Sequence, residues 1–443
     1  MKIQLSEHFT YKKLLRFTLP SIVMMVFSSI YGVVDGLFVS NFAGTDKFTA
    51  VNLIMPFLMI LGTVGFMFGA GGSALIAKTL GEGDKGKANR LFSLFVYTSI
   101  IIGAVIAVLG IVFLAPVSRL LGAKGVMLDD CVTYGTYILI ALPAFILQME
   151  FQTFFVTAEN PNLGLAFTVA SGVTNIVLDA LFVGVFGWGI IGAAVATGLS
   201  QAVGGFGPLF YFFSKNSSLL HLSKTNFDGK ALLKACGNGS SELMANVSMS
   251  LVGMLYNIQL LKYAGEDGVA AYGVLMYVTM LFLAIFIGYS VGTAPIVGYH
   301  YGAQNHDELK GLLKKSLRII LLSSVAMCIL AELLATPLSL VFVSKKAELL
   351  KMTKDAFRIY SFSFLFAGLA IYGSSFFTAL NNGLVSAIIS FLRTLVFQVA
   401  AVLILPLVMN GVDGIWLSIV VAELMAAVLT AIFLVANKKK YQY

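Results

Sequence analysis

Residues 42–72, FAGTDKFTAVNLIMPFLMILGTVGFMFGAGG, align without a gap with residues 263–293, YAGEDGVAAYGVLMYVTMLFLAIFIGYSVGT, at an offset of 221. Each stretch joins a short polar segment to a long apolar run that contains several glycines. The same offset returns at FFVTAEN (154–160) and SFFTALN (375–381). We therefore expect the chain to consist of two copies of one structural unit.

Apolar runs continue through the rest of the chain. Apolar residues make up 58% of the 443 residues, and charged residues only 11%, which is less than half of the roughly 25% found in soluble domains. A membrane-spanning helix needs about 20 mostly apolar residues. We predict an all-α integral membrane protein with twelve spans, at 14–40, 50–78, 91–115, 132–156, 163–186, 190–213, 236–261, 269–300, 316–343, 357–380, 384–407 and 413–436.

The order of the spans predicts how the two copies are related. Equivalent spans are six apart, so both copies cross the membrane in the same direction, and parallel repeats are related by an axis along the membrane normal. We expect two six-helix lobes with pseudo-two-fold symmetry, an N-lobe at 1–213 and a C-lobe at 236–443, joined by a linker at 214–235. Two such lobes enclose a central cavity whose access can alternate.

The basic residues of the predicted loops indicate the orientation. Loops on the side of the termini carry 19 lysines and arginines, and loops on the opposite side carry nine. Loops rich in lysine and arginine stay in the cytoplasm, so both termini and the linker are expected there, with the chain in a bacterial inner membrane. This bias accounts for the net charge of +8, and we expect no nucleic-acid partner.

Six of the 21 acidic residues fall inside predicted spans, where each costs roughly 2.5–3.5 kcal/mol to insert and points to a functional site. Asp179 lies mid-span, and Asn175 lies one turn before it on the same helix face. Thr197 follows on the next span. Their oxygens suit a hard cation such as Na⁺, or a proton on the carboxylate. A structural polar cluster is the alternative.

Asp35 lies near the outer half of the first span, where a polar helix end is the alternative to an ion site. At an offset of 221, Asp35 corresponds to Tyr256 and Asp179 to Ala400. The second copy lacks both acids, so the fold does not require them. This difference favours an ion-binding role for Asp35 and Asp179 in the N-lobe.

Three charged residues in the second copy are weaker candidates. Glu242 and Glu423 either line the cavity of the C-lobe or lie near a span end. Arg393 lies about nine residues into its span, too deep to reach the membrane surface easily. We therefore expect Arg393 to be paired or to face the cavity.

Enzyme signatures do not occur in the sequence. We find no H-E-x-x-H, G-x-S-x-G or Walker A pattern, and the three cysteines are too widely spaced for a zinc site or a disulfide framework. We predict a transporter without an enzymatic activity or a cofactor, driven by an ion gradient because it lacks a nucleotide site. An intramembrane enzyme and a channel are alternatives, and the repeat favours alternating access.

Four segments carry a resemblance to a known family. They are LLRFTLPS with Pro20, IYGVVDGLFVSNFAG around Asp35, the glycine-rich second span with GEGDKGKANR, and TNIVLD with GAAVAT. They resemble the multidrug and toxic compound extrusion (MATE) family over nearly the whole chain. The resemblance implies twelve helices in two lobes and antiport of cationic or amphipathic molecules against H⁺ or Na⁺. The ion-site residues of its N-lobe match Asp35, Asn175, Asp179, Thr197 and, in the fourth span, Tyr134.

Two features depart from the family pattern. Ala180 follows Asp179 where many members have proline, and the seventh and tenth spans show no clear match to the C-lobe carboxylates of some members. The N-lobe site is therefore favoured. A lipid-linked oligosaccharide flippase of the same superfamily is the nearest alternative. It would need a strongly cationic cavity, for which Arg393 alone is too little.

The resulting hypothesis is an antiport cycle. An ion at Asp35 and Asp179 would neutralise the acids and let the first span bend at Pro20, because proline removes a backbone donor. The cavity would then shrink and release a drug-like substrate. We expect a monomer whose partners are small molecules and the lipid bilayer.

Overall fold

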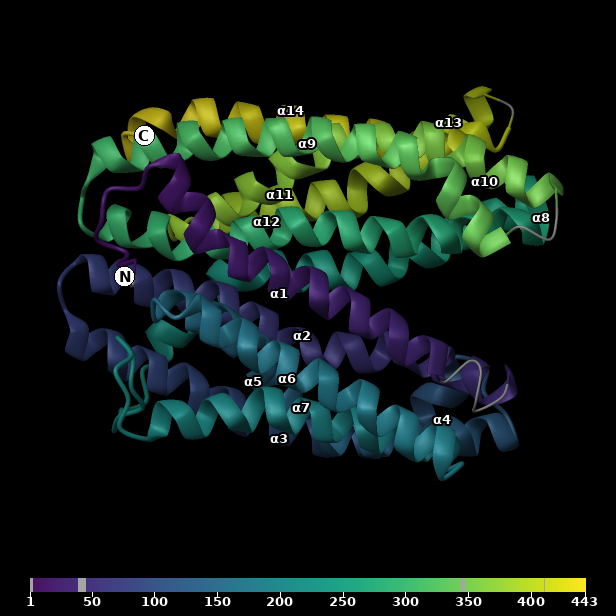
Figure 1. Cartoon of the computed structure of the whole chain (residues 1–443), viewed down its shortest axis with the longest axis horizontal. Helices are drawn as coiled ribbons and strands as arrows, with labels where there is room; N and C mark the ends of the chain where they lie inside the picture. Colours follow the sequence, from purple (N-terminus) through teal and green to yellow (C-terminus); the bar gives the residue numbers. More distant parts are fainter. Residues whose placement is uncertain (1–2, 39–44, 344–346, 410) are drawn as a thin grey trace.

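The computed structural model describes residues 3–38, 45–343, 347–409 and 411–443, and its long helices lie roughly parallel (Figure 1). Every regular element in these ranges is helical. The elements are α1 (Tyr11–Phe38), α2 (Thr45–Gly81), α3 (Lys85–Leu120), α4 (Val126–Ile140), α5 (Leu142–Thr157), α6 (Pro161–Asp179), η2 (Ala180–Val185), α7 (Gly189–Phe213), α8 (Gly229–Gly302), α9 (His306–Val343), α10 (Ala347–Tyr360), η3 (Ser361–Ser363), α11 (Phe364–Ala379), α12 (Gly383–Phe391), η4 (Leu392–Val396), α13 (Phe397–Met409) and α14 (Asp413–Tyr441).

The helices of the structure can be compared with the twelve predicted membrane spans. Ten helical segments of the described residues are long and apolar enough to cross a membrane, and the bent pair α4 and α5, at 53° to each other, supplies an eleventh. Helix α8 is 74 residues long and is interrupted at Gly265, with φ 64° and ψ −157°, so it contains two crossings. The twelve spans are confirmed, although residues 39 and 40 of the first predicted span lie outside the described residues.

Two bundles lie side by side in Figure 1, one formed by α2 to α7 and the other by α8 to α14, with α1 running diagonally between them. We call the bundle of α2 to α7 the N-lobe and the bundle of α8 to α14 the C-lobe. The predicted lobe bounds, 1–213 and 236–443, stay a prediction, because α1 packs on helices of both bundles. Both termini lie at the same end of the molecule, which we call the terminal end, and we call the opposite end the far end.

The helix bounds show the repeat directly. Helices α5 and α11 have 16 residues each and begin 222 residues apart. Both end in the same turn, in which the Asn160 N–H donates to the Phe155 carbonyl (2.8 Å) and the Asn382 N–H donates to the Phe377 carbonyl (2.9 Å). The predicted alignment of FFVTAEN with SFFTALN at 221 is therefore wrong by one residue.

The connection between the lobes is shorter than the predicted linker at 214–235. Helix α7 ends at Phe213, and α8 begins at Gly229. The carboxylate of Asp228 starts α8 by accepting from the backbone N–H groups of Lys230 and Ala231, both at 3.1 Å. Because aspartate is a favourable N-cap, the first turns of α8 occupy the end of the predicted linker.

Glycines bring the backbones of the two lobes together near the terminal end. A Cβ atom on Gly81 of α2 would lie 2.0 Å from the carbonyl oxygen of Tyr299 on α8. A Cβ on Gly302 of α8 would lie 2.0 Å from the carbonyl oxygen of Lys78 on α2. Neither position accommodates a side chain, so α2 and α8 meet backbone to backbone.

Helix α1 contacts both lobes. In its first half, a Cβ on Gly292 of α8 would lie 2.9 Å from the Cβ of Thr18, and the nearby Pro20 is buried inside the helix. In its second half, a Cβ on Gly172 of α6 would lie 2.9 Å from the ring of Tyr31. The predicted hinge residue therefore lies where α1 packs on the C-lobe, and Asp35 lies where α1 packs on the N-lobe.

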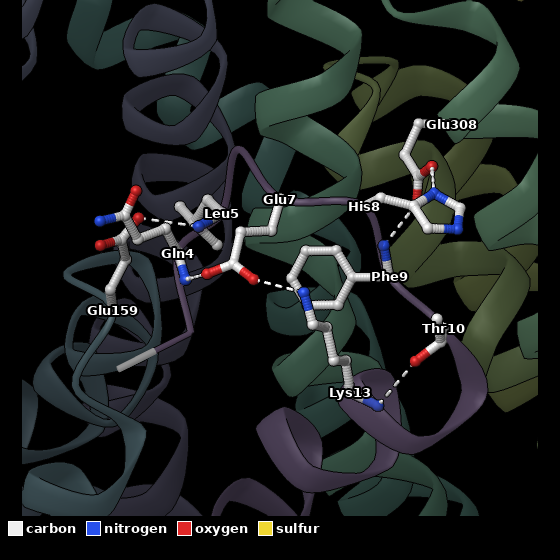
Figure 2. A network of polar contacts seen from close by, with 9 residues as sticks. All are labelled: Gln4, Leu5, Glu7, His8, Phe9, Thr10, Lys13, Glu159 and Glu308. Atoms are coloured by element: carbon white, nitrogen blue, oxygen red, sulfur yellow. Dashed lines mark hydrogen bonds and ion pairs between the residues drawn. The ribbon is translucent and has the colours of Figure 1, made fainter. Parts of the chain in front are cut away.

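The residues that precede α1 also bind both lobes, as Figure 2 shows. The Leu5 N–H donates to Oε1 of Glu159, between α5 and α6, at 2.8 Å. The Phe9 N–H donates to Oε1 of Glu308 on α9 at 2.9 Å, and Nδ1 of His8 lies 2.6 Å from the other oxygen of that carboxylate. This N-terminal segment joins the N-lobe to the C-lobe at the terminal end.

Candidate ion-binding site

Four predicted site residues meet inside the N-lobe. Asp35 comes from α1, Asn175 and Asp179 from α6, and Thr197 from α7. The Asp35 side chain lies against those of the other three. Asp179 and Asn175 are buried, and Asp35 and Thr197 are half-buried. We call these four residues the N-lobe cluster.

Tyr134 lies beside the N-lobe cluster. It is a buried residue of α4, and it interacts electrostatically with both Asp35 and Asp179. The structure thus places the residue that matched the family in the fourth span next to both carboxyl groups.

Irregular backbone positions the cluster. Asp179 is the last residue of α6, and the π-helical turn η2 follows it directly; such turns are frequent at functional sites. Gly187 and Gly189 adopt positive φ angles of 68° and 56°, which let the chain reverse toward α7. A Cβ on Gly192 would lie 3.1 Å from Phe182 of η2. The glycine therefore lets α7 pack closely on η2 and bring Thr197 beside the carboxyl groups.

The cluster side chains approach one another, but most of their polar atoms lack a partner with hydrogen-bond geometry among the described residues. Six buried side-chain atoms have no hydrogen-bond partner among the described residues: Oδ1 of Asp35, both carboxylate oxygens of Asp179, Oδ1 and Nδ2 of Asn175, and Oγ1 of Thr197. A buried polar atom without a partner costs roughly 1–3 kcal/mol, and a charged one costs more. The contacts between these side chains therefore do not replace the solvation that their polar atoms lose.

Positive charge is also missing from the cluster. No ion pair of the described residues includes Asp35 or Asp179. A proton would neutralise one carboxylate, and Na⁺ would find carboxylate, amide and hydroxyl oxygens, the hard ligands that such a cation prefers. The arrangement therefore fits an exchangeable monovalent cation such as H⁺ or Na⁺.

A cavity of about 40 Å³ reaches the cluster at Thr197. Its wall also includes Gln201 of α7 and the apolar residues Met55 and Met59 of α2. This volume is enough for a water molecule to enter. Thr197 therefore borders a mostly apolar cavity to which Gln201 adds a second polar side chain.

The weaker candidates meet in the C-lobe. Nε of Arg393 in η4 donates to both carboxylate oxygens of Glu423 on α14, at 2.8 and 3.1 Å. Glu242 on α8 interacts electrostatically with Arg393. We call Arg393 and Glu423 the C-lobe pair. Its positive charge is already balanced, so it differs from the N-lobe cluster.

Two other acids of the predicted spans have separate surroundings. Glu150 on α5 is fully buried and faces Ser99 of α3, and neither carboxylate oxygen has a partner among the described residues. Glu332 on α9 accepts a hydrogen bond from the Ser361 hydroxyl. Neither acid belongs to the N-lobe cluster.

Sequence reasoning missed a polar chain that adjoins the cluster. The Tyr31 hydroxyl faces the Gln148 side chain. Nε2 of Gln148 donates to Oγ of Ser171 (3.1 Å), which donates to the carbonyl of Ser200 (2.7 Å). Tyr31 precedes Asp35 by one turn and Ser171 precedes Asn175 by one turn, so helical spacing contained a signal for these two residues. Gln148 had no such signal.

Comparisons with known proteins agree with this fold. The MatE family model matches residues 20–181 and 243–404, once in each lobe. The multidrug export protein MepA of Staphylococcus haemolyticus is 24% identical over 433 residues, which cover 97% of this chain and 94% of that protein. A crystal structure of MATE in complex with MaL6 has a TM-score of 0.93 and 23% identity, with 98% of both chains covered. An outward-facing multidrug resistance MATE family transporter of the MOP superfamily has a TM-score of 0.92 and 24% identity, with 98% of this chain and 97% of that chain covered.

Proposed function

This chain belongs to the MatE family, and from that premise we propose that it is an antiporter that exports cationic or amphipathic small molecules in exchange for H⁺ or Na⁺. The relatives that span nearly all of it are named as multidrug export proteins, which supports an efflux transporter rather than an enzyme. The ion and the substrate class are the specific parts of this proposal.

The N-lobe cluster is the observation that carries the proposal. Two carboxyl groups lie together without a basic partner in the described part of the chain, where the neighbouring amide and hydroxyl groups also have unpaired atoms. A basic side chain beside the two carboxyl groups would neutralise them permanently. A cation that binds and leaves would neutralise them in only part of the cycle, as coupling to an ion gradient requires.

Helix α1 provides a physical link between ion binding and the two lobes. Its second half carries Asp35 into the N-lobe cluster, and its first half packs on α8 around Pro20. Neutralising Asp35 changes the balance of forces on a helix that both lobes share. We propose that α1 then bends at Pro20, where a backbone hydrogen bond is missing, and that the substrate leaves because its affinity differs between the two states.

A flippase for an anionic lipid-linked sugar is less well supported. Such a substrate requires positive charge in the cavity to bind its pyrophosphate. Arg393 is engaged by Glu423, and Glu242 adds a further negative group nearby. The C-lobe pair together with Glu242 therefore suits a cationic substrate better than an anionic one.

The proposed setting is a bacterial inner membrane with the terminal end in the cytoplasm. The bias of basic residues toward the loops at this end supports the orientation. A cysteine introduced at residue 216 in the linker, and labelled in intact cells, tests this orientation. Reaction of that cysteine with a membrane-impermeant reagent added outside would overturn the orientation.

Transport in proteoliposomes tests the function. Vesicles that contain the purified protein are loaded with ethidium, a fluorescent cation, and a Na⁺ gradient or a pH gradient is imposed separately. We expect ethidium efflux under at least one gradient and its loss in Asp179→Asn, with Glu332→Gln as the matched control that retains transport. Ethidium efflux of equal rate in the absence of both gradients would contradict antiport.

A further inference from the structure

We propose that the interior of the N-lobe contains a polar passage that carries the coupling cation between the N-lobe cluster and the terminal end. The passage is lined by Ser171, Gln148, Gln152 and Thr168, and we call it the N-lobe passage. It rests on the proposed function and deepens it, because it gives the ion a route separate from the substrate cavity that the sequence predicts between the lobes.

The passage begins at the cluster and follows one face of α6. Asn175, Ser171 and Thr168 precede Asp179 by four, eight and eleven residues, and all four side chains are buried. At a rise of 1.5 Å per residue, the distance from Asp179 to Thr168 along the helix is about 16 Å. The hydrogen bond from Gln148 to Ser171 joins this face to α5.

Glutamines of α5 continue the passage toward the terminal end. Gln148 and Gln152 lie one turn apart on the same face of α5 and are both buried. Oε1 of Gln148 and Nε2 of Gln152 have no hydrogen-bond partner among the described residues. Since an unpaired buried amide atom costs about 1–3 kcal/mol, these atoms favour a polar ligand such as water inside the lobe.

A small cavity lies between these side chains. Its volume is about 10 Å³, and Gln148, Gln152 and Thr168 form its polar wall, so it has room for about one water molecule. Gly204 leaves room for the Gln148 side chain beside this cavity, because a Cβ on Gly204 would lie 2.7 Å from Cδ of Gln148. A water there has amide and hydroxyl partners and can relay a proton, and the same oxygens can coordinate Na⁺.

Phenylalanine rings close the passage at its terminal side. Phe155 and Phe167 stack with their ring centroids 5.5 Å apart, and both line the small cavity. The ring centroid of Phe212 lies 4.9 Å from that of Phe155 and 5.6 Å from that of Phe151. An ion that leaves the small cavity toward the terminal end has to pass this apolar layer, so the passage requires that the rings move.

The C-lobe shows that packing does not require such a passage. At the 222-residue offset of α5 and α11, Gln152 corresponds to Ser374 and Thr168 to Ser390. The two serine hydroxyls lie 3.0 Å apart and bond to each other, and Ser386, which corresponds to Gly164, lies 2.9 Å from Ser374. The hydroxyls of the C-lobe satisfy one another, whereas the glutamine amides of the N-lobe passage line a cavity and retain atoms without a partner among the described residues.

Counter-ion flux tests the passage. Proteoliposomes with an imposed ethidium gradient contain a pH-sensitive dye in one experiment and a Na⁺-sensitive dye in another. We expect Gln152→Leu to slow the flux of whichever ion the wild type couples by about tenfold, which corresponds to roughly 1.4 kcal/mol in the barrier. Ethidium affinity should not change, and the midpoint of thermal unfolding should stay equal or rise, because the unpaired amide is removed.

A second variant and a matched control sharpen the test. Gln148→Leu should slow the flux similarly, and it should fold because the Ser171 hydroxyl retains its bond to the Ser200 carbonyl. Ser374→Ala makes the equivalent change in the C-lobe and should leave the flux unchanged. Wild-type flux that persists in both glutamine variants would overturn the passage alone, and so would a parallel loss of flux and thermal stability. Absence of counter-ion flux in the wild type would overturn the proposed function and the passage together.

Discussion

The N-lobe and the C-lobe have the same helices but treat buried charge in different ways. In the C-lobe, Glu423 is bonded to Arg393, and the charges cancel within the protein. In the N-lobe, Asp35 and Asp179 lie together without a basic partner among the described residues. One scaffold therefore contains a complete ion pair in one copy and two acids without a counter-charge in the other, and we propose that only these two acids bind a cation from outside.

The largest effect is expected from these two acids. Asp179→Asn replaces a carboxyl group that can bind a proton or Na⁺ by an amide that can bind neither in the same way. Gradient-driven ethidium efflux should fall to the level of protein-free vesicles, with a milder loss in Asp35→Asn. The variant should still purify as a folded protein, since the change removes a charge that has no counter-charge. Undiminished efflux in Asp179→Asn would mean that the two lobes do not differ in the way described.

The complete ion pair should respond in stability. Arg393→Met leaves Glu423 as a buried carboxylate without its partner, and breaking such a pair typically costs about 3–5 kcal/mol. The double variant Arg393→Met, Glu423→Leu should recover most of the loss, because it removes both charges. The midpoint of thermal unfolding in detergent measures this. If the single and double variants unfold alike, the pair does not neutralise a buried charge.

Ligand identity can be separated within the N-lobe cluster. Asn175→Ala removes an amide oxygen that is useful to Na⁺ but dispensable for a proton on Asp179. Transport driven by Na⁺ should therefore weaken more than transport driven by a pH gradient, measured with the same ethidium-loaded vesicles. An equal decrease in both modes would show that Asn175 positions Asp179 and does not bind the ion.

The smallest effect is expected at the position of the C-lobe that corresponds to Asp35 in the N-lobe. Tyr256 occupies the corresponding position, and its hydroxyl lies 2.7 Å from Oγ of Ser418. Ser418→Ala should lower the free energy of unfolding by about 1 kcal/mol, the usual worth of one hydrogen bond, and should leave ethidium efflux unchanged. A strong loss of efflux would give the C-lobe a part in ion coupling that the comparison denies it.

The helical spans and the repeat could be predicted from the sequence because both depend on short stretches of neighbouring residues. Apolar run length sets the spans, and the repeated segments set their pairing. The N-lobe cluster was also accessible, since Asn175 and Asp179 share a helix face and the acids are costly in a membrane. The pairing of Arg393 with Glu423 could not be predicted from the sequence. These residues are 30 positions apart, and only the packing of η4 on α14 brings them together. Gln148 and Gln152 were missed because uncharged side chains carry no comparable insertion cost.

The contacts of the N-terminal segment have a consequence for how the protein is made. Glu308, which accepts a hydrogen bond from the Phe9 N–H, is synthesised about 300 residues after Phe9. Thr18 likewise finds Gly292 only after α8 has entered the membrane. The N-terminal segment can therefore contact the N-lobe through Glu159 early in synthesis. Its docking onto α8 and α9 must come later, after the second half of the chain has been made.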